Sequence, residues 1–291
     1  MARLVPLTIL ASAVLPGALA WGALGHAAVA YVATNFVASE TKTYMQQLLG
    51  DTTDNYLASV ASWADTYRST AEGKFSAPYH FIDALDDPPH SCGVDLERDC
   101  GAKGCVVSAY ANYTQRLLEP SLALAQRQMA AKMVIHFAGD IGQPLHCENL
   151  DVGGNDVTVT FNGTKTNLHA AWDTSIPESI AGDGSSVLTV AKPWAATLTK
   201  AIKSGQFKAA AAGPWVSSID LGDPEATALA WAVESNAFVC TVVMPSGLDA
   251  VEGKEIGGAY ATSAEPTVSM QIAKQGYRLA KWLDAIVAEL A

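Results

Sequence analysis

The chain has 291 residues, with 18 basic and 29 acidic side chains and a formal net charge of −11. Such acidity disfavours the binding of a polyanion through a basic surface, although bound cations can reverse the sign of the charge at one site. The charge therefore argues against a basic nucleic-acid-binding surface, and it neither supports nor excludes nucleic acid as a substrate.

The first predicted element is a secretory signal. Arg3 precedes an apolar run from Leu4 to Leu15, and the Ala18-Leu-Ala20 end fits a signal-peptidase site. The run is too short to span a membrane comfortably. We therefore expect residues 1–20 to be removed, which leaves 17 basic and 29 acidic residues, a net charge of −12, in a chain that begins at Trp21. No later stretch is long and apolar enough to predict a membrane span, and we expect a secreted, extracellular monomer with no stable membrane association.

The mature part, residues 21–291, contains no Pro/Ser linker, repeat or low-complexity tract. Its length allows one large domain or two small ones, and we expect one. Helix-like patterns cover 25–38, 40–49, 57–68, 105–118, 121–141, 167–174, 186–204, 223–243 and 265–290. Residues 155–161 alternate in polarity before an Asn162-Gly163 turn signal, which predicts one short hairpin. The predicted fold class is mainly α, a single-domain multi-helix bundle with a short β-hairpin.

In a secreted chain, most of the cysteines should pair. The five are Cys92, Cys100, Cys105, Cys147 and Cys240. Cys100 and Cys105 enclose a small loop that glycines can turn, and we expect them to form one disulfide. Cys92 would then pair with Cys240 and tie the middle of the chain to its late part. Cys147 is left over, either as a free thiol or as an additional metal-sensitive group.

Two Asn-x-Thr sequons begin at Asn112 and Asn162. Both are candidate glycosylation sites in a secreted protein. The motif is short and matters only where the asparagine is exposed at the surface.

Two His-x-x-x-Asp pairs are the strongest chemical signal. They are His136 with Asp140 and His169 with Asp173, and His146 follows the first pair in a loop after Pro144. On a helix this spacing puts both side chains on one face, with Cβ atoms roughly 5–6 Å apart. Imidazole nitrogens and carboxylate oxygens are donors that zinc prefers. The pattern predicts a site that holds more than one zinc ion.

Further donors lie in the first part of the mature chain. They are Asp65, His80 and His26, which is five residues after the expected new N-terminus. A free α-amine, with an unperturbed pKa of roughly 7.7–8.0, can also bind a metal once it is deprotonated. The amine of Trp21 is therefore a further candidate ligand.

The ordered set of these motifs resembles the fungal and plant single-strand-specific zinc nucleases, which are secreted three-zinc enzymes. Bacterial zinc phospholipase C is a more distant relative with a similar metal cluster, so the resemblance implies a zinc phospholipase C/nuclease-like fold. It covers essentially the whole mature chain and rests on Trp21-Gly-Ala-Leu-Gly-His26, Trp63-Ala-Asp65, His80-Phe-Ile-Asp83, His136-x3-Asp140, His146 and His169-x3-Asp173.

The resemblance implies a ligand set for three Zn²⁺ ions. The first ion would be held by Asp65, His80, His136 and Asp140. The second would be held by the amine and carbonyl of Trp21, by His26, and by Asp140 as a bridge. The third would be held by His146, His169 and Asp173.

The same resemblance implies the reaction. A hydroxide shared by the first two zinc ions would attack phosphorus in line, and the third ion would bind a phosphate oxygen and the departing 3′ oxygen. The expected products of single-stranded DNA and RNA carry 5′-phosphates, and 3′-mononucleotides would lose their phosphate. Asp65 and Arg68 are the candidate catalytic residues, and Arg68 would stabilise charge on the phosphoryl group.

Five more positions match the substrate-binding residues of the family. Phe81 would stack on a base, Asp83 and Asn155 would hydrogen-bond its edge, and Val152 and Gly153 would wall the slot. Stacking contributes about 1–3 kcal/mol per base with little sequence preference. A paired base must first leave its duplex, which costs a few kcal/mol, so such a slot favours single strands.

The chain departs from the family in two places. The stretches that carry nucleotide-stacking tyrosines in some members here read Gly163-Thr164 and Thr174-Ser175, and the usually acidic residue after His146 is Cys147. Contact with a second base is therefore expected to be weaker or to come from elsewhere.

Simpler interpretations exist for several residues. Arg68 could form a surface ion pair, Phe81 could be core packing, and Asp83 and Asn155 could be turn formers. For the whole protein, the alternatives are a zinc phospholipase C and a non-catalytic secreted zinc-binding protein. The slot motifs around Phe81 and Asn155, and an aspartate at position 173, favour the nuclease.

Overall fold

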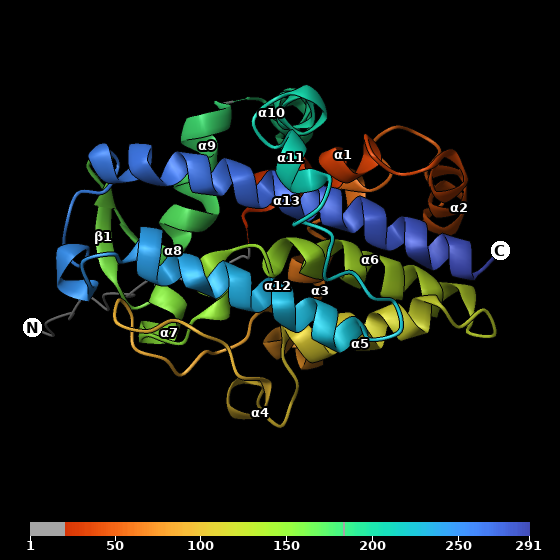
Figure 1. Ribbon diagram of the computed structural model, residues 1–291, viewed down its shortest axis with the longest axis horizontal. Coiled ribbons are helices and arrows are strands. Elements are labelled where there is room, and N and C mark those ends of the chain that lie inside the picture. The colour runs from red at the N-terminus through yellow and green to blue at the C-terminus, as the bar shows by residue number, and fades with distance from the viewer. Residues whose placement is uncertain (1–20, 183) are drawn as a thin grey trace, which may run out of the picture.

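The longest helix, α13 (Ala259–Glu289), is the axis against which several other helices pack. Its 31 residues correspond to roughly 46 Å at 1.5 Å per residue. Helices α1 (Ala23–Thr34), α6 (Leu124–Asp140), α9 (Ile176–Ala181) and α10 (Val187–Ser204) contact it. The computed structural model describes residues 21–182 and 184–291 (Figure 1), and the predicted signal peptide, residues 1–20, lies outside the described residues.

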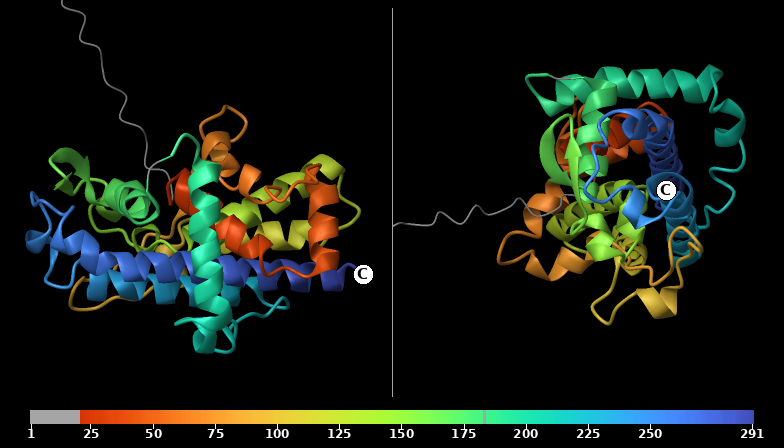
Figure 2. Two further views of the ribbon diagram at one scale, coloured as in Figure 1. Left: turned by 90° about the horizontal axis from the view of Figure 1, so that it is seen from above. Right: turned by 90° about the vertical axis from the view of Figure 1, so that its left-hand side faces the viewer.

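A second group of helices lies beside this axis. Helices α5 (Val106–Leu117) and α12 (Pro224–Phe238) pack on each other, and α5 also packs on α6. The rings of Tyr110, Trp231 and Trp282 join α5, α12 and α13, with centroids 5.5–6.0 Å apart. Helix α10 crosses α13 at a steep angle on the opposite side (Figure 2). A single apolar cluster runs through these helices and forms the core.

Short elements connect the long helices and carry several candidate ligands. The remaining α-helices are α2 (Ser39–Leu49), α3 (Trp63–Tyr67), α4 (Leu96–Asp99), α7 (Asp151–Gly154), α8 (Leu168–Ala170) and α11 (Lys208–Ala211). The 3-10 helices are η1 (Ala58–Val60), η2 (Lys74–His80), η3 (Pro144–Cys147) and η6 (Leu248–Ala250). Two π-helical turns, η4 (Ala171–Ser175) and η5 (Val239–Val243), extend α8 and α12.

The predicted hairpin is present. Strands β1 (Thr158–Phe161) and β2 (Thr164–Asn167) pair antiparallel, with Thr158 opposite Asn167. Asn162 and Gly163 have φ values of 49° and 79°, which is the left-handed backbone that a two-residue turn requires. The mainly α fold class with one short hairpin is therefore confirmed.

One expectation about membranes needs correction. The run Pro224–Val243, which joins α12 and η5, is long and apolar enough to span a membrane by length and composition. In the structure Ala228, Trp231 and Ala232 of this run are buried in the core. The run also carries Cys240, whose disulfide with Cys92 has an S–S distance of 2.05 Å. It therefore packs as a core helix of the bundle.

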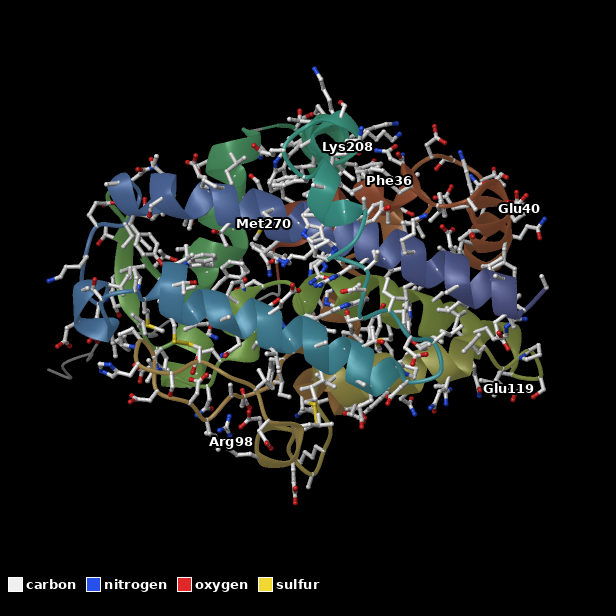
Figure 3. All side chains as sticks on the ribbon, viewed as in Figure 1. Phe36, Glu40, Arg98, Glu119, Lys208 and Met270 are labelled. Carbon is white, nitrogen blue, oxygen red and sulfur yellow. A yellow bond between two sulfur atoms is a disulfide. The ribbon has the colours of Figure 1, made fainter. Side chains whose placement is uncertain are left out.

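Charged side chains lie on the outer surface. The second disulfide lies in a surface loop. Glu40, Glu119 and Lys208 are exposed and point away from the helices (Figure 3). The Cys100–Cys105 disulfide closes the loop between α4 and α5, with an S–S distance of 2.11 Å. Both cysteine pairs of the structure are those expected from the sequence.

Candidate metal centre

Two of the candidate ligands come from the last turns of α6. His136 and Asp140 are fully buried, and the Nε2 atom of His136 lies 3.2 Å from Oδ2 of Asp140. The spacing of four residues brings both side chains to one face of the helix. The helix ends at Asp140, and Pro144 opens η3, where the missing N–H of proline costs nothing.

Asp65 and His80 approach this face from two short elements, α3 and η2. The Nδ1 atom of His80 lies 3.1 Å from Oδ2 of Asp140 and 3.6 Å from Oδ1 of Asp65. The same Asp65 oxygen lies 3.7 Å from Nε2 of His136. Four buried side chains from three elements therefore converge on one point.

Helix α1 places His26 against the other oxygen of Asp140. Its Nε2 atom lies 3.1 Å from Oδ1 of Asp140, and its ring stacks on His136 with centroids 4.0 Å apart. Gly139 allows this approach, because a Cβ at that position would lie 2.6 Å from Nδ1 of His26. Asp140 thus offers one oxygen to His26 and the other to His80 and His136, as a bridging carboxylate would.

A neighbouring cluster contains His146 from η3, His169 from α8 and Asp173 from η4. The Nε2 atom of His169 lies 3.1 Å from Nε2 of His146 and 3.1 Å from Oδ2 of Asp173. His146 Nε2 lies 4.0 Å from Oδ1 of Asp173. All three side chains are buried.

The residue expected at the mature N-terminus lies beside this cluster. Trp21 is fully buried, and the backbone N–H of Gly22 donates to the carbonyl oxygen of Asp173 at 2.7 Å. A Cβ at Gly22 would lie 2.7 Å from Oγ1 of Thr174. The segment that carries Asp173 therefore also anchors the start of the described chain.

The outer hydrogen bonds of the imidazoles show which nitrogens are free to bind a cation. The Nδ1 atoms of His136, His146 and His169 face the carbonyl oxygens of Ala61, His80 and Gly153 at 2.6–2.7 Å. A carbonyl can only accept, so each Nδ1 carries a hydrogen, and in the neutral ring the lone pair of Nε2 faces inward. The lone pairs of His146 and His169 then face each other at 3.1 Å beside a carboxylate. A cation between them would make this arrangement favourable.

Buried carboxylate oxygens without hydrogen bonds support the same conclusion. Among the described residues, Oδ1 of Asp65, both carboxylate oxygens of Asp140 and Oδ2 of Asp173 are buried without a hydrogen-bond partner. Buried charges are normally paired or bound to metals. There are three groups in which the donor atoms lie within 4.8 Å of one another. They are His26, Asp65 and His136; His80, His136 and Asp140; and His146, His169 and Asp173. The residues present therefore fit metal ions bound by nitrogen and oxygen, the ligands that zinc accepts.

The electrostatics keep His80, His146 and Asp140 in a metal-binding form, whereas at His136 and His169 burial lowers the pKa but nearby carboxylates raise it more. Burial lowers the pKa of His80 to about 4, and burial together with the nearby His169 lowers the pKa of His146 to about 3. Burial alone would raise the pKa of Asp140, but the surrounding histidines outweigh it and hold that pKa well below its usual range. Neutral imidazoles and an ionised carboxylate are the forms that ligate a metal.

Comparison with known proteins identifies the family. A sequence profile described as S1/P1 nuclease matches residues 21–288. The chain belongs to the S1/P1 nuclease family. It is 48% identical to Nuclease S1 of Aspergillus oryzae over 252 residues, which cover 87% of this chain and 86% of that protein. It is 49% identical to Nuclease P1 of Penicillium citrinum over 247 residues, covering 85% and 90%.

More distant members of the S1/P1 nuclease family come from plants. Endonuclease 4 of Arabidopsis thaliana is 31% identical over 263 residues, which cover 85% of this chain and 82% of that protein. Membership of this family implies zinc as the metal and phosphodiester cleavage as the chemistry. The buried histidine and aspartate groups are compatible with a site for several metal ions.

Among the S1/P1 nuclease positions expected to touch substrate, Arg68 is close to the first cluster. Its Nη2 atom lies 3.3 Å from Oδ1 of Asp65, and its side chain is 15% exposed. This ion pair is not a surface pair, because Asp65 is buried among the candidate ligands. Arg68 thus reaches from the metal centre towards solvent.

Phe81 and Asp83 line a cavity of about 350 Å³, together with Pro78, Asp99 and the disulfide loop 101–105. The ring of Phe81 is half-buried and Asp83 is exposed. The cavity walls still desolvate Asp83 in part and, with the nearby Asp99, raise its pKa. An aromatic face and a carboxyl group, which follow the candidate ligand His80 in the chain, therefore share one cavity.

Val152, Gly153 and Asn155 are not among the residues that line this cavity. The Asn155 side chain donates to the carbonyl oxygen of Val152 at 2.8 Å, so it closes its own turn. Val152 is 63% exposed and has φ 58° and ψ 49°, an unusual backbone for a β-branched residue. Gly153 instead acts through its carbonyl oxygen, which accepts from His169.

Sequence reasoning missed several residues that support the candidate ligands. The carbonyl of Ala61 faces His136, Gly139 makes room for His26, and the Gln143 amide donates to Oδ1 of Asp173 at 2.6 Å. Backbone carbonyls leave no trace in a sequence. Gln143 stands in a Gly-Gln-Pro-Leu-His run, in which glutamine carries no recognisable signal of its own.

The remaining cysteine and the sequons are also placed. Cys147 is a buried free thiol that donates to the carbonyl oxygen of Ile141 at 3.7 Å, and it belongs to none of the three donor groups. Asn112 and Asn162 are exposed, as glycosylation requires. Asn162 and Gly163 lie in the hairpin turn, where their N–H groups donate to the Glu255 carboxylate.

Proposed function

We propose that this chain is a secreted nuclease that uses three zinc ions to cleave single-stranded DNA and RNA to 5′-phosphorylated products, and that it removes 3′-phosphates from mononucleotides. The observation that carries the proposal is the presence, in a member of the S1/P1 nuclease family, of buried His/Asp groups in which the donor atoms lie within 4.8 Å of one another; two of these groups share His136 and the third is separate. The relatives named Nuclease S1, Nuclease P1 and Endonuclease 4 support the same class of reaction.

The residues would divide among the three ions as follows. Asp140 would bridge the first two, because its two oxygens face different histidines. The first ion would take Asp65, His80, His136 and Asp140; the second the amine and carbonyl of Trp21, His26 and Asp140; the third His146, His169 and Asp173. When bound, close zinc ions lower the pKa of water and hold the attacking and leaving oxygens of an in-line displacement.

The protein groups around the ions would orient the substrate. Arg68 lies 3.3 Å from Asp65 and would donate to a phosphoryl oxygen at the edge of the first cluster. Phe81 would stack on a base, and Asp83 would accept from its edge in the same cavity. An unpaired base enters such a cavity without leaving a duplex, which saves a few kcal/mol.

Removal of the signal peptide during secretion would complete the ligand set of the second zinc ion. Removal of residues 1–20 would free the amine of Trp21, five residues before His26, and the buried position of Trp21 supports this role. The exposed sequons at Asn112 and Asn162 would carry sugar in a eukaryotic host. Sequencing of the secreted protein should show Trp21 as the first residue.

A paired assay tests the proposal. The processed protein should hold three zinc ions, cut heat-denatured DNA and RNA far faster than duplex DNA, and leave 5′-phosphates on the products. Release of phosphocholine from phosphatidylcholine without cleavage of DNA would instead establish a phospholipase C. Bound zinc with no phosphoester hydrolysis would establish a non-catalytic zinc-binding protein.

The base cavity has its own test. Phe81→Leu removes the stacking ring and should lower kcat/KM on single strands by about 5- to 150-fold, which corresponds to 1–3 kcal/mol. Phe75→Leu is the matched control, since Phe75 is 53% exposed and does not line the Phe81 cavity. Equal kcat/KM values for the two variants would reject the role of Phe81.

A further inference from the structure

Gln143 is hydrogen-bonded to three of the candidate ligands at once. Its backbone N–H donates to the carbonyl oxygen of Asp140 at 3.0 Å, and its own carbonyl accepts from the N–H of His146 at 3.0 Å. Its side-chain Nε2 donates to Oδ1 of Asp173 at 2.6 Å. The residue therefore lies between the end of α6, which carries ligands of the first cluster, and both η3 and η4, which carry ligands of the neighbouring cluster.

The orientation of the Gln143 amide is fixed by its surroundings. Its Oε1 atom accepts from the backbone N–H of Leu145 at 2.6 Å. Because a backbone N–H can only donate, the oxygen must face Leu145 and the nitrogen must face Asp173. The side chain is fully buried, so water does not compete for either bond.

This bond divides the two oxygens of Asp173 between different tasks. Oδ1 is occupied by the Gln143 amide, whereas Oδ2 is buried without a hydrogen-bond partner among the described residues and lies 3.1 Å from Nε2 of His169. The Leu145 contact at the same time caps η3, the short helix that carries His146. One side chain thus sets the orientation of two candidate ligands of the same cluster.

We propose that Gln143 is a positioning residue for the third zinc ion. It holds Asp173 so that Oδ2 alone faces the metal, and it holds η3 so that His146 faces the metal too. This inference rests on the proposed function for the identity of the metal and for the number of ions. Groups that hydrogen-bond to metal ligands typically change metal affinity by about 10–100-fold when they are replaced.

The test compares zinc affinity in two buried-glutamine variants. Gln143→Leu removes both side-chain bonds. Gln271→Leu is the matched control, because Gln271 is equally buried and its side-chain amide donates to the Gly142 carbonyl and to Ser235, neither of which is a candidate ligand. Each protein is titrated with Zn²⁺ against a competing chelator, and bound zinc per chain is measured by elemental analysis.

Gln143→Leu should keep two tightly bound zinc ions and bind the third about 10–100-fold more weakly. Gln271→Leu should bind all three as the unmodified protein does, with at most a lower Tm. Gln143→Glu is the second variant, since it keeps the size and the Leu145 acceptor, but places a carboxylate against Asp173; it should weaken the third ion at least as much.

Unchanged affinity for the third zinc in the folded Gln143 variants, or equal weakening in Gln271→Leu, would overturn the inference. A protein that binds three zinc ions but hydrolyses no phosphoester would overturn the proposed function alone, because the zinc titration does not depend on activity.

Discussion

Gly139→Ala is the sharpest test of how the second ion would be held. Gly139 lies in α6, one residue before Asp140, and faces the imidazole of His26. An added Cβ would lie 2.6 Å from Nδ1 and 2.9 Å from Cε1 of that ring. Ordinary van der Waals contact begins at about 3.4 Å, so the ring must retreat by about 0.8 Å.

The His26 ring cannot retreat without losing its position against Asp140. It is 1% exposed, and it is stacked on His136 with centroids 4.0 Å apart. Metal–ligand distances tolerate only about 0.2 Å of change, so the shift is several times what the second site allows. The fold should survive, because overpacking costs about 1–3 kcal/mol while alanine recovers about 1 kcal/mol over glycine in a helix.

The expected result is a folded protein that binds the second zinc at least tenfold more weakly and has correspondingly low nuclease activity. Zinc per chain is measured against graded free zinc, with the Tm as a check of folding. Gly93→Ala is the control, since a Cβ there meets nothing within 4 Å and the φ of Gly93 is not in the positive range that favours glycine. If Gly139→Ala holds every zinc ion with unmodified affinity, the assignment of His26 is wrong.

Other predictions address the remaining ligands and the pH response. An extra N-terminal methionine before Trp21 should cost one zinc and most activity, since it removes the ligating amine; full activity with unchanged zinc content would contradict that role. Asp140→Ala should disturb two ions, whereas His169→Ala should empty only the third site, and metal analysis of the two variants must differ for this to hold. In chelator-treated protein, stability should peak near pH 6.5. Stability should fall towards pH 4. The pKa of His80 is lowered to about 4 in the folded protein, so His80 stays neutral there while the same residue in the unfolded chain takes up a proton. Stability should also fall towards pH 9. Burial lowers the pKa of His136, but Asp140 and then Asp65 raise it more, to about 9. The folded protein therefore keeps a proton that the unfolded chain releases as the pH rises. Urea midpoints from pH 4 to 9 test this, and a midpoint that rises steadily over the range would count against it.

Regular helices and the hairpin could be predicted because their signals are local. The pattern over 186–204 corresponds to α10, and Gly50, with φ 71°, ends α2 as a left-handed cap. The last helix was predicted to start at residue 265 but begins at Ala259, since Pro266 signals a helix start and yet lies inside α13. A proline within the first turns of a long, well-packed helix is tolerated, and the sequence pattern alone does not reveal this.

The arrangement of the candidate centre could be predicted only in part. The spacing of four residues brings His136 to Asp140, and His169 to Asp173 across a π-helical turn. Asp65 stands in a five-residue helix and His80 ends a 3-10 helix, neither of which has a readable period. Their approach to α6 depends on tertiary packing. The resemblance to a family therefore had to supply what periodicity could not.

The long axis of the bundle has a practical consequence. Leu290 and Ala291 share a surface cavity with α2 residues such as Tyr44, whose hydroxyl accepts from Arg127 in the first turn of α6. Asp140 lies thirteen residues further along α6, which corresponds to roughly 20 Å. A purification tag or a solid support attached at the carboxyl end would therefore lie far from the candidate metal centre, whereas an appendage at the buried Trp21 would lie beside Asp173 of that centre.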